Sequence, residues 1–322
     1  MQTPKTIALE EHYLPDYLAD YWEPTVAGMA PSLYETIKRR LTHPQSDRLA
    51  DMDAAGIDQM VLSVAGPGVQ AERSAALAIE LAKRANDDLA KMIAHDQTRF
   101  SGFAHLPMQD PKSAADELER CVSELGFVGA LVNGHTHGVY LDHADLDVFW
   151  ERAAGLKVPV YIHPTDPPKK YIALEDQPML RRPAWEWTVE TATHALRLVF
   201  NGVFDRHPDA HIILGHMGET LPYLLWRFDS RSKFLRDPSD NSPLPSDIIR
   251  KHISVTISGM LDAAPLNCAI AALGDTNIMF GADYPFEEPE PAIEFIRAVD
   301  IPDATRAKIM HGNAERLLRL AR

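Results

Sequence analysis

Short runs of apolar residues alternate along the chain with longer segments in which apolar residues lie three or four positions apart. A run that is apolar at nearly every position is typical of a strand buried on both faces, whereas the wider spacing is typical of an amphipathic helix. The pattern predicts strands at residues 6–9, 59–64, 100–104, 128–132, 158–162, 211–214, 253–257 and 278–280.

Helices are predicted in most of the segments that separate these strands. The clearest start signal is Asp110 followed by Pro111, since an aspartate before a proline is a common helix N-terminus. The predicted helices span residues 71–93, 113–125, 146–156, 186–204, 221–235, 263–273, 291–299 and 304–318.

The strands and helices alternate, which predicts a parallel sheet built from repeated strand–helix units. Eight units favour a closed but distorted (β/α)8 TIM barrel, with a doubly wound open sheet as the alternative. We expect residues 1–322 to form one domain, because no linker, repeat or low-complexity tract divides them. Two long connections, residues 13–46 and 164–184, are expected to cover the barrel mouth, where active sites are built.

Charge and cysteine content narrow the class of protein. The formal net charge is −14, which argues against a nucleic-acid partner, because binding to phosphates rests on lysine and arginine. No apolar run is long enough to span a membrane. The two cysteines, Cys121 and Cys268, lie in no Cys-x-x-Cys pair, so neither a disulfide framework nor a cysteine metal cluster is expected. We therefore expect a cytoplasmic protein.

Candidate chemistry begins at the end of the first strand, with Glu10, Glu11 and His12. Strand alternation is expected to place Glu10 and His12 on one face and Glu11 on the other. A carboxylate and an imidazole on one face can reach the same metal ion. Taken alone, such a pair is more often a surface glutamate and a hydrogen-bonded histidine.

Three further strand ends carry side chains that can bind metal. His163 closes the fifth strand, His216 follows the sixth between Gly215 and Gly218, and Asp283 follows the eighth. Burying such groups is unfavourable unless they are hydrogen-bonded or bound to a cation. Because the carboxyl ends of barrel strands share one mouth, we predict a divalent-metal site of mixed nitrogen and oxygen ligands, suited to Zn²⁺, Mn²⁺ or Fe²⁺.

Other polar residues near strand ends have competing interpretations. His135 and His137 form a His-x-His pair, but they follow a glycine beyond the fourth strand and are interpreted as part of a rim loop. Asn133, at the end of that strand, is the better candidate for contacting a substrate. Arg227 could bind a substrate carboxylate or could pair with a neighbouring aspartate at the surface.

The chain resembles the amidohydrolase superfamily in its decarboxylase branch, which includes the ortho-hydroxybenzoate decarboxylases. The resemblance covers almost the whole chain and rests on residues 8–12, 125–134, 213–219, 283–287 and 312–317. It implies catalytic roles for His216 and Glu219 beside Asp283, and substrate contacts for Arg227 and Asn133. The ligand set that it implies is Glu10, His12, His163 and Asp283.

The resemblance also implies a cofactor and a reaction. Since Glu10 stands where hydrolases of the superfamily have histidine, and no bridging lysine is found, we expect one Zn²⁺ or Mn²⁺ per chain and no organic cofactor. The expected reaction is the reversible, non-oxidative decarboxylation of 2,6-dihydroxybenzoate, 2,3-dihydroxybenzoate or salicylate by a homotetramer or homodimer. Two alternatives stay open: a metal-dependent lactone or amide hydrolase, and a non-catalytic metal-binding protein.

Overall fold

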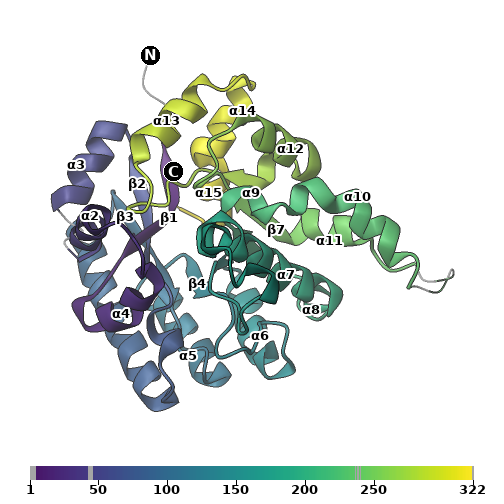
Figure 1. Ribbon diagram of the computed structural model, residues 1–322, viewed down its shortest axis with the longest axis horizontal. Helices are drawn as coiled ribbons and strands as arrows, with labels where there is room; N and C mark the ends of the chain where they lie inside the picture. Colours follow the sequence, from purple (N-terminus) through teal and green to yellow (C-terminus); the bar gives the residue numbers. More distant parts are fainter. Residues whose placement is uncertain (1–4, 43–45, 236, 238, 240, 321–322) are drawn as a thin grey trace.

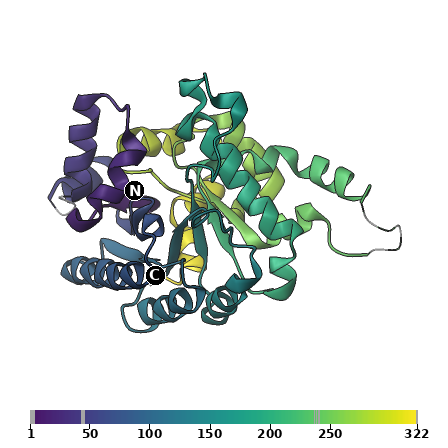
Figure 2. The ribbon, with the colours of Figure 1, turned by 60° about the horizontal axis from the view of Figure 1, so that its bottom comes forward.

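The computed structural model describes residues 5–42, 46–235, 237, 239 and 241–320. Its eight strands are parallel and follow one another around the sheet in sequence order, with helices outside them (Figures 1 and 2). This order confirms the barrel and differs from that of a doubly wound sheet, in which the strand order reverses. The strands are β1 (Ile7–Tyr13), β2 (Gln59–Val64), β3 (Phe100–His105), β4 (Gly129–Asn133), β5 (Val160–His163), β6 (Ile212–Leu214), β7 (Ile253–Thr256) and β8 (Ile278–Met279).

The seam between β1 and β8 closes the barrel with few hydrogen bonds. Leu9 N donates to the Phe280 carbonyl at 3.1 Å, and His12 N donates to the Tyr284 carbonyl at 2.7 Å. Gly281 lies between these two bonds, where a side-chain carbon would come within 2.4 Å of the Leu9 carbonyl oxygen. The barrel is therefore irregular at the point where its first and last strands meet.

A β-bulge at Glu10 determines which side chains of β1 enter the barrel. Leu9 pairs with Val61 and Glu11 with Leu62, so Glu10 is an extra residue, with a φ of 74°. Leu9 and Val61 belong to the apolar cluster inside the barrel. Strict alternation from Leu9 would send Glu11 inward, whereas the bulge turns Glu10 and His12 inward and Glu11 outward. The predicted faces were right, but the bulge rather than simple alternation produces them.

Helices surround the strands and bury an outer apolar layer against them. Asp110 caps α5 as predicted, because its side chain accepts a hydrogen bond from Ser113 N. The helices are α1 (Ala19–Trp22), α2 (Pro31–Thr42), α3 (Ser46–Ala55), α4 (Ala75–His95), α5 (Pro111–Ser123), α6 (Asp147–Leu156), α7 (Glu186–Phe200), α8 (Val203–Arg206), α9 (His216–Glu219), α10 (Leu221–Ser232), α11 (Pro245–His252), α12 (Ala263–Leu273), α13 (Pro289–Ala298), α14 (Asp303–Ala307) and α15 (Asn313–Leu317).

Several predicted helix boundaries were wrong for identifiable reasons. The helix expected from residue 71 begins at Ala75, because Ser74 caps it. Gly202, with a φ of 68°, separates α7 from α8 within the single helix expected at residues 186–204. A π-helical turn, Lys308–Gly312, interrupts the last predicted helix between α14 and α15.

The connections above the strands also contain regular structure. The first connection includes α1 and α2, and the one after β5 contains the 3-10 turns Ile172–Leu174, Pro178–Leu180 and Arg182–Ala184. The arm formed by α10 and α11 projects from the side of the barrel (Figure 1). No helix within the described ranges combines the length and apolar character needed to cross a membrane.

Candidate metal centre

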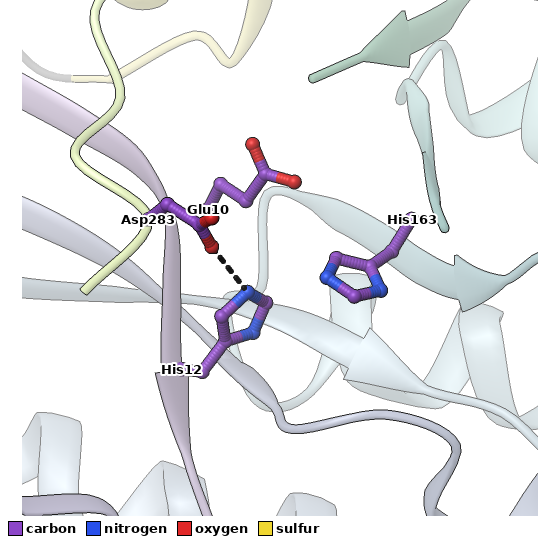
Figure 3. A group of neighbouring side chains, drawn as sticks. All are labelled: Glu10, His12, His163 and Asp283. Atoms are coloured by element: carbon purple, nitrogen blue, oxygen red, sulfur yellow. Dashed lines mark ion pairs between the residues drawn. The ribbon is translucent and has the colours of Figure 1, made fainter. Parts of the chain in front are cut away.

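Four side chains from three strand ends converge at the barrel mouth. Glu10 and His12 come from β1, His163 is the last residue of β5, and Asp283 follows β8 (Figure 3). One ligand atom from each of the four lies within 4.8 Å of the others. The structure therefore brings together the residues that the sequence resemblance implied as metal ligands.

The Glu10 carboxylate is fully buried, and only one of its two oxygens accepts hydrogen bonds from described residues. Its Oε2 accepts hydrogen bonds from Tyr161 Oη at 2.6 Å and from Ser258 Oγ, whereas Oε1 has no hydrogen-bond partner among the described residues. Gly215 makes room for both oxygens, which would lie 2.6 and 2.7 Å from a side-chain carbon at that position. Burial raises the pKa of Glu10, so its ionised form needs a nearby cation.

The two imidazoles are held with one nitrogen directed at the shared centre. His163 Nδ1 donates to the Pro164 carbonyl at 2.9 Å, which leaves the lone pair of Nε2 free. His12 Nδ1 lies 3.1 Å from Ser63 Oγ, and its buried Nε2 has no hydrogen-bond partner among the described residues. Burial lowers the pKa of His163 to about 3, so this ring is neutral and able to bind a metal.

Asp283 faces His12, which belongs to the four-residue cluster, and His216, which lies outside it. Its Oδ1 lies 3.5 Å from His12 Nε2 and its Oδ2 lies 3.7 Å from His216 Nε2. Burial alone would raise the pKa of Asp283, but the contacts with these two rings outweigh it and hold the pKa well below the usual range. The carboxyl group is therefore ionised in this arrangement, as a metal ligand must be.

His216 is fixed by an unusual stretch of backbone. Five consecutive residues, 216–220, have positive φ values between 50° and 77°. Non-glycine residues adopt this left-handed region at a cost of about 1–2 kcal/mol each, so such a run persists only where its surroundings enforce it. The turn brings His216 Nδ1 to 2.6 Å from Glu219 Oε1. Although burial disfavours the imidazolium, Glu10 and Glu219 raise the pKa of His216 well above its usual value.

A divalent cation fits this cluster. Two carboxylates and two imidazoles are a ligand set used by Zn²⁺ and Mn²⁺. A cation among them would bind Glu10 Oε1 and His12 Nε2, two buried atoms of the cluster that lack hydrogen-bond partners among the described residues. It would also compensate the negative charge of Glu10 and Asp283 at the mouth.

The two residues implied as substrate contacts lie in different surroundings. Asn133 is buried at the end of β4, where its backbone N donates to Gln70 Oε1 at 2.7 Å and its Oδ1 has no partner among the described residues. It is the strand partner of His163, which places it beside the ligands. Arg227 is exposed on α10, and the structure places it in no described hydrogen bond or ion pair.

His135 and His137 hold the rim loops together. His135 Nε2 lies 3.0 Å from the Asp166 carbonyl oxygen, and His137 Nε2 lies 2.9 Å from that of Glu72. Both contacts bridge connections that follow different strands, in agreement with the interpretation of this segment as a rim loop.

Sequence reasoning missed the groups that hold Glu10. Tyr161 lies in a predicted strand two residues before His163, and this spacing was a usable signal because it places both side chains on the inner face. Ser258 lies just beyond the last residue that the structure assigns to β7, where a serine has no distinctive pattern.

A (β/α)8 barrel with two carboxylates and two imidazoles at the carboxyl ends of its strands is typical of a metal-dependent enzyme. The chain belongs to the amidohydrolase family: the family model described as Amidohydrolase matches residues 12–320. The chain is 42% identical over 325 residues to a gamma-resorcylate decarboxylase from Rhizobium sp. (strain MTP-10005), with 98% of each chain covered.

Solved structures resemble this fold over nearly its whole length. A 2,6-dihydroxybenzoate decarboxylase in complex with 2,6-dihydroxybenzoate superposes with a TM-score of 0.93 at 39% identity, covering 99% of this chain and 100% of that chain. A dihydroxybenzoic acid decarboxylase from Polaromonas sp. JS666, with bound manganese and the inhibitor 2-nitroresorcinol, has a TM-score of 0.93 at 40% identity. The match with the Polaromonas protein covers 99% of this chain and 98% of that chain.

Proposed function

We propose that this chain is a carboxy-lyase that uses one divalent metal ion to decarboxylate an ortho-hydroxybenzoate, with 2,6-dihydroxybenzoate as the leading candidate. The observation that carries the proposal is the convergence of Glu10, His12, His163 and Asp283 at the mouth of a barrel whose relatives are named as decarboxylases of this class. The proposal assigns the whole chain, residues 1–322, to one catalytic domain.

Mn²⁺ is the leading candidate for the metal, with Zn²⁺ as the alternative. The Polaromonas relative was solved with manganese, and the ligand atoms here suit either ion. When bound, the ion would act as a Lewis acid toward the carboxylate and hydroxyl oxygens of the acid and would offset their negative charge. Glu10 and Asp283 would hold the ion through oxygen, and His12 and His163 through Nε2.

The surroundings of the cluster suit an aromatic acid. The Phe286 ring lies 5.7 Å from the His12 ring, and the Trp187 ring lies 6.5 Å from the His163 ring. Aromatic side chains at such distances provide apolar faces for a benzoate ring. Asn133, whose Oδ1 lacks a protein partner among the described residues, would accept a hydrogen bond from a substrate hydroxyl.

Arg227 is the proposed partner of a substrate carboxylate. Its guanidinium has the bidentate geometry that carboxylates favour, and no described ion pair engages it. The Arg227→Met variant should raise KM for the acid with a smaller effect on kcat. An unchanged KM would remove Arg227 from the binding site.

The chemistry that the protein must supply is a proton for the ring carbon that bears the carboxyl group. Asp283 is the proposed acid, because it is both a proposed ligand and the carboxyl group nearest to Nε2 of His216, at 3.7 Å against 3.9 Å for Glu10. His216 Nε2 would deliver the proton to Asp283 Oδ2, while Glu219 fixes the ring through Nδ1. Once the ring carbon is protonated, the C–C bond breaks, CO2 leaves, and the electron pair of that bond moves into the ring in the same step and restores its aromaticity.

Hydrolysis of a lactone or amide is the competing function on the same barrel. In that reaction Asp283 would act as a base toward a water molecule rather than as an acid toward a ring carbon. The relatives named above are decarboxylases, and the first-strand Glu10 differs from the histidine expected of the hydrolases.

The proposal includes a homo-oligomer, tetramer or dimer, in the cytoplasm. Large apolar side chains on and just beyond α10 are exposed, with Tyr223 at 82%, Trp226 at 77% and Leu235 at 93%, which is typical of an interaction surface. Light scattering after size exclusion tests the oligomer, and a monomer at micromolar concentration would contradict it. Cys121 and Cys268 are free thiols, as suits a reducing compartment, and cell fractionation tests the location.

The substrate is tested on protein purified without chelator. Metal content is measured by mass spectrometry, and CO2 release is then followed with 2,6-dihydroxybenzoate, 2,3-dihydroxybenzoate and salicylate. We expect about one divalent ion per chain and CO2 release from at least one acid, fastest with 2,6-dihydroxybenzoate. No release from any acid, together with hydrolysis of a lactone or amide, would support the competing function.

A further inference from the structure

We propose that Glu11 is a positioning residue that replaces the missing backbone ladder at the β1–β8 seam and thereby holds Glu10 and Asp283 in their ligand geometry. The inference rests on the proposed function for its kinetic readout, but not for its metal-binding readout. Glu11 is fully buried, although it points away from the metal centre. A buried carboxylate outside the ligand set is costly unless it has a structural partner.

Glu11 spans the gap that the bulge creates. Its Oε1 accepts a hydrogen bond from Ala282 N at 2.8 Å, and its Oε2 accepts one from Tyr284 N at 3.3 Å. The backbone bonds from Leu9 and His12 flank this gap on either side. One side chain therefore supplies two acceptors where the distorted strand supplies no carbonyl.

The two amides that Glu11 binds lie on either side of Asp283. Asp283 has a φ of 66° and Glu10 has a φ of 74°, so both carboxylate ligands sit in the left-handed region. Non-glycine residues in this region are held there by their surroundings. Glu11 binds the N–H of the Gly281–Ala282 peptide and the N–H of the Asp283–Tyr284 peptide, and so restrains the backbone on both sides of Asp283. Glu11 is also the residue between Glu10 and His12 in the sequence, so it links three of the four residues of the cluster.

Arg48 on α3 completes the support behind the ligands. It is fully buried, donates through Nη2 to the His12 carbonyl, and has its guanidinium carbon 4.6 Å from the centre of the Tyr284 ring. It is thus a cation that contacts both sides of the seam. Burial raises the pKa of Glu11, and the charge of Arg48 opposes this by favouring the ionised carboxylate. Glu11 and Arg48 together tie β1 to the segment after β8 from outside the barrel.

The Glu11→Gln variant tests the proposal, because an amide offers one acceptor oxygen and places a donor against the second backbone N–H. We expect the Kd for Mn²⁺, measured by titration calorimetry, to rise about 10- to 100-fold, the range found when groups that orient metal ligands are removed. The kcat should fall by a comparable factor, with a smaller change in KM. Wild-type Kd and kcat in a folded Glu11→Gln protein would overturn the proposal.

Glu117→Gln is the matched control. Glu117 is also buried and hydrogen-bonded, to Asn86 and Arg120, but it contacts none of the four ligands. We expect this variant to lose thermal stability while its Kd for Mn²⁺ stays at the wild-type value. An equal rise in Kd for both variants would mean that replacing any buried glutamate weakens Mn²⁺ binding, which contradicts a specific role for Glu11.

A measurement on the wild-type protein covers the case in which Glu11→Gln fails to fold. Hydrogen exchange of the Ala282 and Tyr284 amides is followed in metal-free protein labelled with ¹⁵N-alanine and ¹⁵N-tyrosine. We expect slow exchange at both amides before any Mn²⁺ is added, because the carboxylate already binds them. Fast exchange that slows only with Mn²⁺ would overturn the proposal.

The proposed function and the role of Glu11 can fail separately. If the wild type binds Mn²⁺ but decarboxylates no acid, the proposed function fails, while the Kd and exchange measurements still decide the role of Glu11.

Discussion

The Nε2 atom of His216 lies 3.7 Å from Oδ2 of Asp283, while Nδ1 of the same ring lies 2.6 Å from Oε1 of Glu219. Because the short contact to Glu219 fixes the ring, only Nε2 is presented to Asp283. Asp283 in turn touches the ligand His12. In the proposed function, the proton route and the metal site therefore share a single carboxyl group, which leads to separate predictions for the residues on each side of it.

Replacing Asp283 with asparagine should remove both of its proposed roles, as a metal ligand and as the acid. The variant cannot carry a proton to the ring carbon, so we expect kcat to fall by about 10²- to 10⁴-fold or more. The rate of CO2 release measures the effect at saturating Mn²⁺. Asp116→Asn, on the exposed face of α5, is the control and should keep wild-type kcat. Substantial activity in Asp283→Asn would show that another group delivers the proton.

Glu219→Gln should separate proton handling from metal binding. The amide can still accept the Nδ1 hydrogen bond but no longer carries the charge that favours the imidazolium, so kcat should fall about 10- to 100-fold. Glu219 is not a ligand, and the Kd for Mn²⁺ should therefore stay near the wild-type value. A large loss of Mn²⁺ affinity with an unchanged kcat per bound ion would show that Glu219 supports metal binding rather than proton handling.

Gly215→Ala should displace the Glu10 carboxylate. The added carbon would lie 2.6 and 2.7 Å from its two oxygens, closer than non-bonded atoms allow. We expect Mn²⁺ affinity to fall by at least about 10-fold, as titration calorimetry would measure. Gly155→Ala on α6 is the matched control, because nothing lies within 4 Å of the added carbon. Equal Mn²⁺ affinities in both variants would show that Glu10 is not held as described.

His105 should make the fold sensitive to acid. It is buried, its Nε2 accepts from Val69 N at 2.9 Å, and burial lowers its pKa from 6.5 to about 4. Between these two values the unfolded chain binds the proton more readily than the folded one, so the free energy of unfolding falls as the pH falls.

The His105→Gln variant isolates this contribution. It should be less stable than the wild type at neutral pH, yet its melting temperature should drop less between pH 6.5 and pH 4. Thermal melts of both proteins across that range give the difference in melting temperature at each pH. The other buried histidines are present in both proteins, so their contributions cancel in this difference. Parallel losses of stability would mean that His105 does not titrate as its burial implies.

The strands could be predicted from the sequence because nearly all of their side chains are buried. Residues 59–64, for example, were predicted as a strand and form β2 with the same limits. Helix α2 was missed, since its buried positions, Ile37 and Leu41, are few among polar neighbours. Helix α11 was missed for a similar reason, because it is short and five of its 8 residues are charged or polar.

The residues of the candidate metal site could be located because a barrel brings its strand ends together. Glu10, His163 and Asp283 all lie at or just beyond the ends of predicted strands. The role proposed for Glu11 could not be foreseen, since it depends on the bulge at Glu10 and on amides 271 residues or more away in the sequence. Local patterns carry no information about a contact of this range.

The most direct test of metal-dependent decarboxylation is made on one preparation in two states. The protein is stripped of metal with a chelator, checked by mass spectrometry, and assayed for CO2 release from 2,6-dihydroxybenzoate before and after Mn²⁺ is restored. We expect no release from the stripped protein and full recovery with about one Mn²⁺ per chain. Release at an undiminished rate from protein free of metal would show that the decarboxylation does not depend on a metal ion.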